Sequence, residues 1–369
     1  MGENRVVENV KLNPSVLIVR LGAMGDILHA LPAVAMLRRS LPEARIGWVV
    51  ERRWRELLCA PEIPLAGSRG VGRPLVDEVH LVDTRAWRKQ VLASNTRREF
   101  LSAIGELRAR EYRAALDMQG AIKSATVAEL SGAKTVFGFR KPRERVARVF
   151  YNTLVDGRAE HVIERNVEVV QTWLEEIGLS RVTSTLQPGA ALLPRDKASE
   201  ARILSTLKAM GLDRSPLAIL NPGAGWGAKQ WSPQRYGELA KRLASRGLRS
   251  IINYGPGEET LAVDAVAASD GKAVPLFSSL SELMGLARRS ELFVGGDTGP
   301  MHLAALLGVR TVALFGPTDP ARNGPYWSGT RVLRDAASRT SYSHRRTEDA
   351  GLVKITVERV MGEIEALLD

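Results

Sequence analysis

The stretch VLIVRLGAMGDILHALPA, Val16–Ala33, decides the fold of this chain. A short apolar run rich in β-branched residues leads through two glycines into apolar residues spaced three and four positions apart. This order predicts a buried strand, a tight turn and a helix, which together begin a βαβ unit. Asp26 stands at the start of the predicted helix, and ligands of open α/β sheets bind at this edge, beyond the carboxyl ends of the strands. The acid is therefore the first candidate for a functional residue.

The same alternation runs along the whole chain and predicts an α/β protein with parallel sheets covered by helices. In the first half the predicted strands are VLIVRL, RIGWVV, EVHLV, AALDM and KTVFGF, and the predicted helices are Asp26–Ser40, Arg97–Arg110 and Ala121–Leu130. In the second half the strands lie in LAILNPGAG, SIINYG, VPLF, LFVGGD and TVALFG, and the helices are Gln234–Arg246, Glu258–Ser269, Leu280–Arg289, one from Pro300, and Thr356–Leu368.

Length and one change in composition predict the domain organisation. A chain of 369 residues is about twice the usual size of one domain, so two domains are expected. From about Arg181 to Glu200, Ser, Thr, Pro and Gly mix without clear periodicity, as they do in linkers. We predict an N-terminal domain over 1–185, a C-terminal domain over 186–350, and a final helical segment over 351–369 that packs on either domain.

The charge balance points to an anionic partner. The formal net charge is +11, which suits nucleic acid, an acidic membrane surface or a phosphorylated substrate. Only 5% of residues are aromatic, and neither a zinc-ligand spacing nor a long Lys/Arg run occurs. These features disfavour nucleic acid, and we predict no nucleic-acid partner.

Cysteine content and apolar stretches indicate the compartment. Cys59 is the only cysteine, so an intrachain disulfide is impossible and a buried structural thiol is favoured over a catalytic one. The first residues lack the apolar core of a signal peptide, and the longest apolar stretches, Ile27–Leu37 and Met301–Val309, are interrupted or too short to span a bilayer. The sequence predicts a cytoplasmic protein.

The loop NPGAGWGAKQWSP, Asn221–Pro233, follows a predicted strand and precedes a helix whose start is marked by Ser232 and Pro233. Its glycines let backbone N–H groups approach an anion, and Lys229 adds a mobile positive charge, so the loop could hold a diphosphate without a metal. The Walker spacing GxxxxGK(S/T) is absent. Taken alone, the loop is better explained as a surface turn with an exposed lysine.

The loop and helix GGDTGPMHLAALLG, Gly295–Gly308, form a second candidate anion site. Asp297 and Thr298 can cap the helix, while its free N–H groups face a ligand. The alternative is simply a well-capped helix. His302 lies one turn further on in an apolar stretch, where a lone histidine is more often structural than a ligand.

Glu258 follows another strand end, in NYGPGEE, and could bind ribose hydroxyls or be a solvated acid at a helix start. Strand-end glycine loops in both halves indicate a transferase, with a nucleotide on one domain and its reaction partner on the other. The chain contains no DxD pair, which favours charge neutralisation by Lys229 and helix N-termini over a divalent ion.

Together, several motifs resemble the heptosyltransferases of glycosyltransferase family 9, and the likeness covers nearly the whole chain. They are VLIVRLGAMGDILHALPA, RAWRK, DMQGAIKSA, RERVARVFYN, the Lys229 loop, GGDTGPMHLAALLG and FGPTDP. The resemblance implies a GT-B fold, in which two Rossmann-like domains with parallel sheets face each other across a cleft. DMQGAIKSA, RERVARVFYN and HVIERN are most similar to the heptosyltransferase I group, which adds the first heptose to the inner Kdo of Kdo2-lipid A from ADP-heptose.

The resemblance also implies site residues. Asp26 matches the general base of an inverting transfer, Lys229 the lysine on the donor diphosphate, and Glu258 the acid near the donor ribose. The remaining implied donor residues are Gly225, Asp297, Thr298, Gly299 and His302. The implied acceptor residues are Gly25, Arg85, Gln119, Lys123, Arg143 and Glu144. A basic acceptor wall suits the carboxylates and phosphates of Kdo2-lipid A.

Three departures from the family pattern affect donor binding more than reaction class. Ala224 and Gly225 stand where some relatives have hydroxyl side chains, so backbone N–H groups would have to serve the phosphate. SRTSYSHRRTEDAG, Ser338–Gly351, matches no motif, and the first dozen residues form an extension.

The implied protein is a metal-independent monomer on the cytoplasmic face of the inner membrane. ADP-heptose is a substrate, so no cofactor is expected, and the basic charge suits peripheral attachment to an anionic inner leaflet. Two other functions stay open: a family 9 transferase acting on a later core acceptor, and a non-catalytic protein that binds a nucleotide-sugar or an anionic lipid. In the second case Asp26 is only a helix cap.

Overall fold

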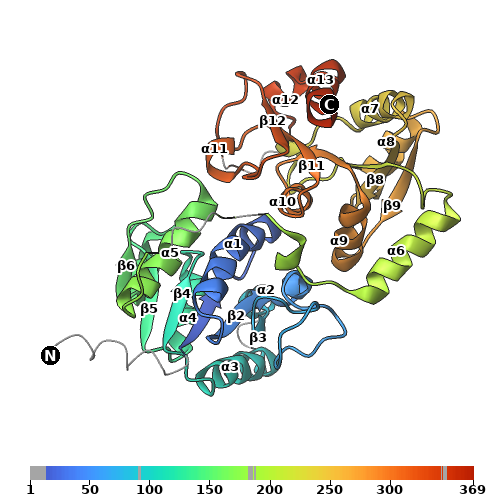
Figure 1. Cartoon of the computed structure of the whole chain (residues 1–369). Coiled ribbons are helices and arrows are strands. Elements are labelled where there is room, and N and C mark those ends of the chain that lie inside the picture. The colour runs from blue at the N-terminus through green and yellow to red at the C-terminus, as the bar shows by residue number, and fades with distance from the viewer. Residues whose placement is uncertain (1–13, 90–92, 182–185, 187, 342, 344–346) are drawn as a thin grey trace. The chain divides into compact units, whose positions relative to one another are not determined.

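The computed structural model describes residues 14–89, 93–181, 186, 188–341, 343 and 347–369. The chain divides into two compact units: Met1–Leu186 with Ala191–Pro194, and Gln187–Ala190 with Arg195–Asp369 (Figure 1). The N-terminal extension noted in the sequence lies outside the described residues, except for its boundary with the first strand.

The first unit is built on a six-stranded sheet of order β3-β2-β1-β4-β5-β6, with every neighbouring pair parallel. Its strands are β1 Ser15–Val19, β2 Arg45–Glu51, β3 Glu78–Val82, β4 Ala114–Asp117, β5 Thr135–Phe139 and β6 Thr153–Val155. Its helices are α1 Met24–Ser40, η2 Arg52–Leu57, α2 Thr84–Lys89, α3 Ser94–Arg108, α4 Ile122–Leu130, η3 Arg145–Phe150 and α5 Val162–Glu176.

The second unit repeats this arrangement with the sheet order β12-β11-β10-β7-β8-β9, again with parallel pairs only. Its strands are β7 Leu217–Asn221, β8 Arg249–Tyr254, β9 Ala273–Phe277, β10 Leu292–Gly296, β11 Arg310–Phe315 and β12 Thr330–Arg334. Its helices are α6 Lys197–Ala209, η5 Gly227–Lys229, α7 Pro233–Ser245, α8 Glu259–Ala267, α9 Leu280–Arg289, α10 Gly299–Leu306, α11 Pro320–Asn323, α12 Ala350–Lys354 and α13 Val357–Leu368. The short helix η4 Ala190–Leu192 belongs to the second unit at Ala190 and to the first at its other two residues.

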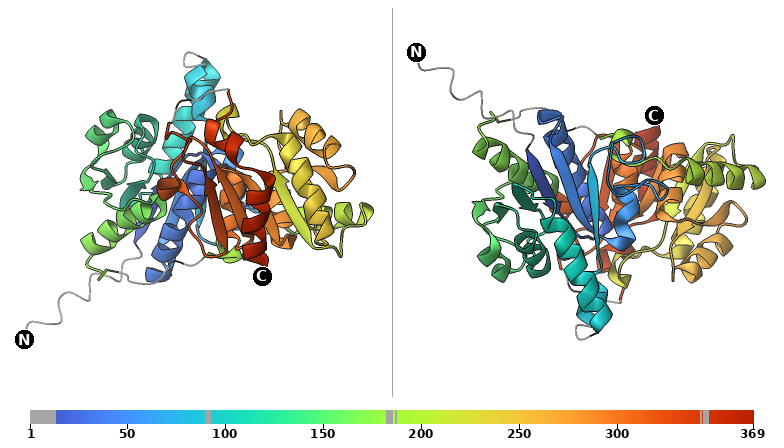
Figure 2. Two further views of the ribbon diagram at one scale, coloured as in Figure 1. Left: turned by 90° about the horizontal axis from the view of Figure 1, so that it is seen from above. Right: turned by 90° about the horizontal axis from the view of Figure 1, so that it is seen from below.

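Helices cover both faces of each sheet, as Figures 1 and 2 show. In the second unit, Ala218 and Leu220 of β7 belong to one apolar core, while Leu217 and Ile219 belong to another. Successive strand residues point to opposite faces, so this alternation places one core on each side of the sheet. The strands are buried on both faces, which is why they read as continuous apolar runs in the sequence.

Every predicted strand and helix is present. The observed ends differ from the predicted ones by no more than three residues, except that LAILNPGAG includes four loop residues after the end of β7 at Asn221. The sequence did not predict the strands β6 and β12, the helices α2, α5, α6, α11 and α12, or the short 3₁₀-helices. α6 begins inside the stretch interpreted as a linker, where Asp196 Oδ2 accepts a hydrogen bond from Ser199 N at 3.1 Å. The β-strands missed are edge strands, one of them only three residues long, and they carry too little pattern to stand out.

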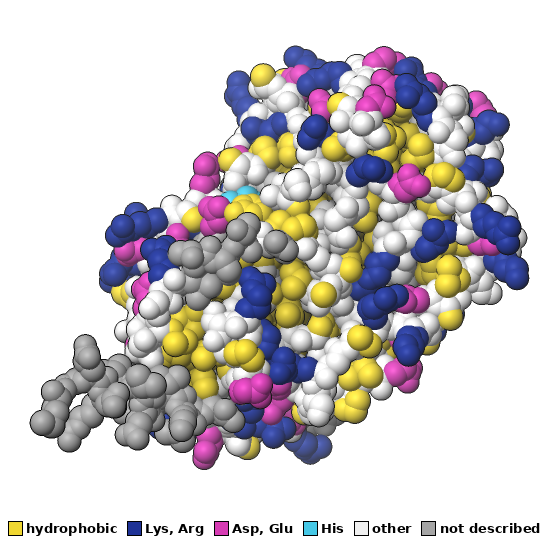
Figure 3. Space-filling view, in the orientation of Figure 1, with side chains coloured by type: hydrophobic (Ala, Val, Ile, Leu, Met, Phe, Trp, Pro, Cys, Tyr) yellow, Lys and Arg dark blue, Asp and Glu magenta, His cyan; other side chains and the backbone are white. Residues whose placement is uncertain are grey.

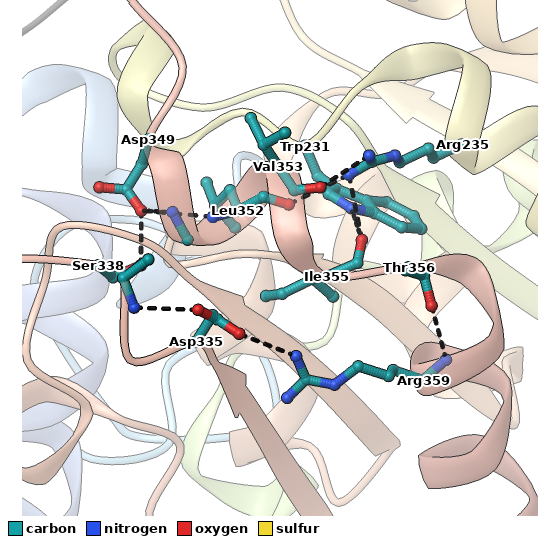
Figure 4. Close-up of polar contacts among 12 residues, drawn as sticks. Trp231, Arg235, Asp335, Ser338, Asp349, Leu352, Val353, Ile355, Thr356 and Arg359 are labelled. Carbon is teal, nitrogen blue, oxygen red and sulfur yellow. Dashed lines mark hydrogen bonds and ion pairs between the residues drawn. The ribbon is translucent and has the colours of Figure 1, made fainter.

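The segment that matched no sequence motif has a structural role in the second unit (Figure 4). Ser338 Oγ donates to Asp349 Oδ1 at 2.5 Å, and Asp349 also accepts from the first backbone N–H groups of α12. Gly351 allows this approach, because a methyl group on it would lie 1.9 Å from Ser338 Oγ. These contacts close the base of the loop between Ser338 and Gly351.

The chain end is fastened to α7 and to β11 and β12 of the second unit. Arg235 donates to the carbonyl oxygens of Leu352, Val353 and Ile355, which end α12 (Figure 4). A cation at a helix C-terminus satisfies carbonyls that have no partner inside the helix. α13 then packs on α7, β11 and β12. The final helical segment is therefore part of the second unit's core.

Candidate active site

At the carboxyl end of β1, Asp26 forms an ion pair with Arg20. Arg20 Nη2 lies 2.7 Å from Asp26 Oδ1, and the Arg20 side chain is 8% exposed whereas that of Asp26 is 37% exposed. Asp26 Oδ2 accepts from Ala23 N at 3.0 Å. Arg20 also donates to the carbonyl oxygen of Met118, beyond β4. The carboxylate is thus held in one orientation by a buried cation while it stays open to solvent.

Helix α1 begins at Met24, so Asp26 lies in its first turn and Gly25 beside it. A methyl group on Gly22 would lie 3.0 Å from Trp54 Nε1, so the turn leaves no room for a side chain there. Gly22 of GAMGD therefore allows close packing against Trp54 at the strand end, and Asp26 is the charged side chain of the turn.

The loop after β4 is organised by Asp117, which is fully buried. Its carboxylate accepts hydrogen bonds from Tyr151 Oη at 2.7 Å, Ser124 Oγ at 2.9 Å and the backbone N–H groups of Gln119 and Gly120. Burial raises the pKa of Asp117, and these hydrogen bonds oppose that shift. The contacts fix the loop that carries the predicted acceptor residues.

Two of the predicted acceptor residues, Gln119 and Lys123, lie on or beside this loop. Gln119 Oε1 accepts from Leu21 N at 2.9 Å, which ties the loop to the end of β1. Lys123 is half exposed, with its Nζ 3.6 Å from Glu51 Oε1 and 3.3 Å from Thr84 Oγ1.

Glu144 and Arg143 lie on the neighbouring segment. Glu144 accepts from Ile122 N at 2.8 Å, at the start of α4, and its own N–H donates to Gly120 O. Arg143 is exposed. Arg85 lies in α2, and its side chain is outside the described part of the structure. The structure thus gathers Gln119, Lys123 and Glu144 around one loop.

In the second unit Lys229 is part of a cluster of four residues. Its Nζ lies 2.6 Å from Asp297 Oδ2 and 4.4 Å from the centre of the Trp226 ring. His302 Nε2 lies 3.1 Å from Asp297 Oδ1. Burial opposes ionisation of Asp297, but the hydrogen bond from His302 and the charge of Lys229 hold its pKa well below the ordinary value. The lysine was predicted to be mobile, and this ion pair fixes it.

Glycines of the neighbouring strands make room for the Lys229 loop. A methyl group on Gly296, the last residue of β10, would lie 2.7 Å from Lys229 O. One on Gly316, just past β11, would lie 3.0 Å from Ala228 O. Gly225, in contrast, is exposed with open space around it. The glycines of LFVGGD and TVALFG thus let backbone approach backbone, and Gly225 leaves an open stretch in the loop.

A row of polar side chains follows the carboxyl ends of β7, β8 and β9. Asn253 Nδ2 donates to Asn221 Oδ1 at 2.7 Å, and Ser278 Oγ donates to Asn253 Oδ1 at 2.5 Å. Glu258 accepts from Gly255 N at 2.9 Å and packs against Gly223, where a methyl group would lie 2.1 Å from Glu258 Oε1. Glu258 therefore lies beside the loop that carries Lys229.

The capping predicted for α10 is wrong. Thr298 occupies the N-cap position but its side chain makes no capping hydrogen bond; its hydroxyl donates to Gly296 O at 3.3 Å. Asp297 is engaged by Lys229 and His302 instead. Gly299 is the first residue of the helix, which therefore begins without a side-chain cap. A helix start of this kind leaves backbone donors for an anionic ligand.

The sequence reasoning missed the groups that hold the predicted ones. Arg20 was visible as a charge inside the apolar run VLIVRL, and Asn221 and Asn253 as polar residues ending LAILN and SIINY. Each sits at the carboxyl edge of a parallel sheet, where a polar side chain at a strand end is a signal for a binding site. Asp117, at the end of AALD, gives the same signal.

The family model described as glycosyltransferase family 9 (heptosyltransferase) matches residues 100–351. Lipopolysaccharide heptosyltransferase 1 of Pseudomonas aeruginosa is 29% identical over 327 residues, covering 84% of this chain and 81% of that protein. The enzyme of the same name from Escherichia coli K12 is 29% identical over 326 residues, covering 86% of this chain and 93% of that protein.

Solved structures of heptosyltransferases also superimpose on this chain. E. coli heptosyltransferase WaaC with ADP superimposes with a TM-score of 0.74 at 26% identity, over 96% of this chain and 99% of that one. The same enzyme with ADP-2-deoxy-2-fluoro heptose gives 0.74 at 25% identity, over 95% and 99%. Two Rossmann-like domains of the GT-B type are therefore confirmed.

Proposed function

Because this chain belongs to glycosyltransferase family 9 and is an enzyme of the heptosyltransferase type, we propose that it transfers a heptose from ADP-heptose to the inner Kdo of Kdo2-lipid A. The chain is similar to relatives named heptosyltransferase 1 over most of its length, and to E. coli heptosyltransferase WaaC, which has been solved with ADP. The observation that carries the proposal is the Arg20–Asp26 pair, a solvent-open carboxylate fixed at the carboxyl end of β1.

The reaction is a single displacement with inversion. The acceptor hydroxyl oxygen attacks C1 of the heptose, the bond from C1 to the ADP oxygen breaks, and Asp26 takes the hydroxyl proton. Two contacts support this role: Ala23 N–H donates to one carboxylate oxygen of Asp26 and Arg20 pairs with the other, so the carboxylate is oriented before substrate binds. Orientation of this kind lowers the cost of reaching the reactive geometry.

Donor binding falls to the second unit, without a metal ion. Lys229 keeps hydrogen-bonding capacity beyond its two contacts with Asp297, to Oδ2 and to the carbonyl oxygen. The uncapped start of α10 adds backbone donors through Gly299, and exposed Gly225 adds more. These groups would neutralise the diphosphate as ADP leaves, and Glu258 would accept from the ribose hydroxyls.

The first unit binds the acceptor through the groups around the Asp117 loop. Gln119, Lys123 and Glu144 stand close to one another there, and exposed Arg143 adds a cation for a Kdo carboxylate or a lipid A phosphate. The protein is proposed to work as a monomer attached peripherally to the cytoplasmic face of the inner membrane. In the described residues, no helix is both long and apolar enough to cross a bilayer.

Mass spectrometry of purified Kdo2-lipid A after incubation with the protein and ADP-heptose tests the proposal. The expected result is the gain of one heptose together with release of ADP. A parallel reaction with an already heptosylated core separates the later-acceptor alternative: product there but not on Kdo2-lipid A would reassign the acceptor. Binding of ADP-heptose with no product on either acceptor would show a non-catalytic binding protein.

A further inference from the structure

The segment Arg140–Phe150 of the first unit combines exposed apolar and cationic side chains. Val146 is 57% exposed and Val149 is 76% exposed, although both lie in η3. Exposed single valines are common, but two in one turn of helix need a reason.

The geometry of η3 sorts its side chains into three rows. In a 3₁₀-helix the residues at i and i+3 lie one above the other. Ala147 and Phe150 form the inner row: Ala147 is fully buried and Phe150 packs on the core of the first unit. Val146 and Val149 therefore form a second row, and exposed Arg145 and Arg148 a third. An apolar row thus runs beside a cationic row on the surface.

The segment is rigidly anchored, so this surface exists before any partner arrives. Tyr151, which follows η3, is 8% exposed, and its hydroxyl donates to buried Asp117 at 2.7 Å. Gly138 allows the ring to lie against β5, because a methyl group there would lie 2.3 Å from it. At the other end, Glu144 N donates to Gly120 O at 2.9 Å.

The charge around the rows is strongly positive. The single acid, Glu144, faces α4, where it accepts from Ile122 N. Ile122 is itself 41% exposed at the start of α4, which packs on η3. Over the face shown in Figure 3, Lys and Arg side chains are spread between Asp and Glu, so the net charge alone marks no patch. The exposed cations of this segment are Arg140, Lys141, Arg143, Arg145 and Arg148, and Arg140 is paired with Asp156, with its Nε 2.6 Å from Oδ1.

We propose that η3 with the start of α4 is the surface by which the protein docks on an anionic lipid bilayer. Val146, Val149 and Ile122 enter the boundary between headgroups and acyl chains, and Arg145 and Arg148 contact lipid phosphates. The proposal rests on the proposed function in one respect: docking here holds the Asp117 loop, with its acceptor residues, close to a lipid-linked sugar.

An apolar row flanked by arginines fits a bilayer better than a purely polar polyanion. Nucleic acid offers phosphates but no apolar layer at the depth of the valine side chains, so the exposed valines would gain nothing from it. A bilayer satisfies both rows together, because the long arginine side chains reach the phosphates while shorter valines pass between them.

The test uses the full-length protein and vesicles of phosphatidylcholine with or without phosphatidylglycerol, and with no lipid A. R145Q/R148Q should weaken the partition coefficient for the anionic vesicles by roughly 30-fold, since each surface cation contributes about 5-fold. V146T/V149T should weaken it by about 5-fold through lost apolar burial, and this loss should persist at high salt.

Matched controls remove the same groups elsewhere. R249Q/R310Q removes two exposed arginines at strand starts of the second unit, and V71T/V263T removes two valines that are 65% and 63% exposed. Both should bind vesicles within about 2-fold of the parent protein, because neither pair joins a valine row to an arginine row.

Activity is measured separately, as ADP release with a water-soluble acceptor that lacks acyl chains. Both η3 variants should keep the parent rate on it, which also shows that they fold. Vesicle binding equal to that of the parent would overturn the docking proposal and leave the transfer reaction standing. An increased KM for the soluble acceptor would show that η3 contacts the acceptor sugar, which also overturns it. A third outcome separates the two proposals. If the parent protein transfers no heptose, but binds anionic vesicles more tightly than the two η3 variants do, the docking surface stands and the proposed function fails.

Discussion

The two units share one topology and place opposite charges at the same point of it. In the first unit, the turn after β1 carries Asp26 with its counter-ion Arg20. In the second, the loop after β7 carries Lys229 with its counter-ion Asp297. In each pair the counter-ion is the more buried member, with side chains 8% exposed in both cases.

The difference teaches how one sheet arrangement serves two kinds of chemistry. A buried counter-ion stabilises the charge that faces the substrate and fixes its direction. Under the proposed function, the acid presented by the first unit is the proton acceptor and the cation presented by the second unit binds the donor diphosphate. In both units the support also comes from the neighbouring strand: Arg20 reaches Met118 beyond β4, and Asp297 follows β10.

The largest effect should come from neutralising the exposed acid of the first unit. Asp26→Asn keeps the shape of the side chain but removes its capacity to take a proton, so turnover should fall by about 10²- to 10⁴-fold. Binding of ADP, measured by calorimetry, should be unchanged. Glu106→Gln on the exposed face of α3 is the matched control and should retain full activity. A variant at position 26 with unchanged turnover would refute the base assignment.

Removing the buried counter-ion of the second unit should chiefly affect stability. Asp297→Asn leaves the charge of Lys229 without its partner in a mostly buried place, which should lower the free energy of unfolding by about 3 kcal/mol. Urea denaturation measures the change, with Asp264→Asn on α8 as the control. If both variants unfold alike, the Lys229–Asp297 pair contributes no net stability.

Lowering the pH should reduce the stability of the first unit more than that of the second. Burial, helped by the charges of Arg110 and Arg45, lowers the pKa of His80 in β3 to about 4. The unfolded chain takes up this proton near its ordinary pKa of about 6.5, so stability falls as pH drops from about 6.5 to about 4, by up to about 3 kcal/mol. The depressed pKa of Asp297 keeps its pair ionised throughout that range.

The check compares the free energy of unfolding at about pH 7 and about pH 4.5 for the parent and His80→Gln. The parent should lose more stability than the variant, and hydrogen exchange should locate the loss in the first unit. Equal losses in the two proteins, or a loss confined to the second unit, would contradict this assignment.

The smallest effect is expected for Lys229, the less buried member of the pair in the second unit. Lys229→Met removes a charge-assisted hydrogen bond to the donor diphosphate, so the Kd for ADP should rise by roughly 10- to 100-fold. Because His302 still pairs with Asp297, the variant should be more stable than Asp297→Asn. Lys208→Met, exposed on α6, should bind ADP normally. Unchanged ADP binding at position 229 would make the lysine purely structural.

Local pattern in the sequence was sufficient for most of the fold and for the strand-end loops that carry the predicted site residues. VLIVRLGAMGD, LAILNPG and LFVGGD each join an apolar run to glycine and a polar residue, and in all three the glycine loop lies at the carboxyl end of a strand, as predicted. Two of the missed elements carry little pattern: β6 is three residues long, and α6 begins inside a stretch mixed in composition. Helix α5 was missed although its buried residues recur at spacings of three and four.

What the sequence determined by itself is the alternation of strand and helix and the position of Asp26 and Lys229, because these depend on residues close together in the chain. Only the tertiary structure decided their counter-ions and the roles of the glycines. Lys229 and Asp297 are separated by 68 positions and meet across neighbouring strands. The cap predicted for Thr298 failed for the same reason: Asp297 binds a distant lysine and the hydroxyl turns to Gly296. Pairing of charges brought together by a sheet has no local signal, and it is this pairing that fixes which charge each unit presents.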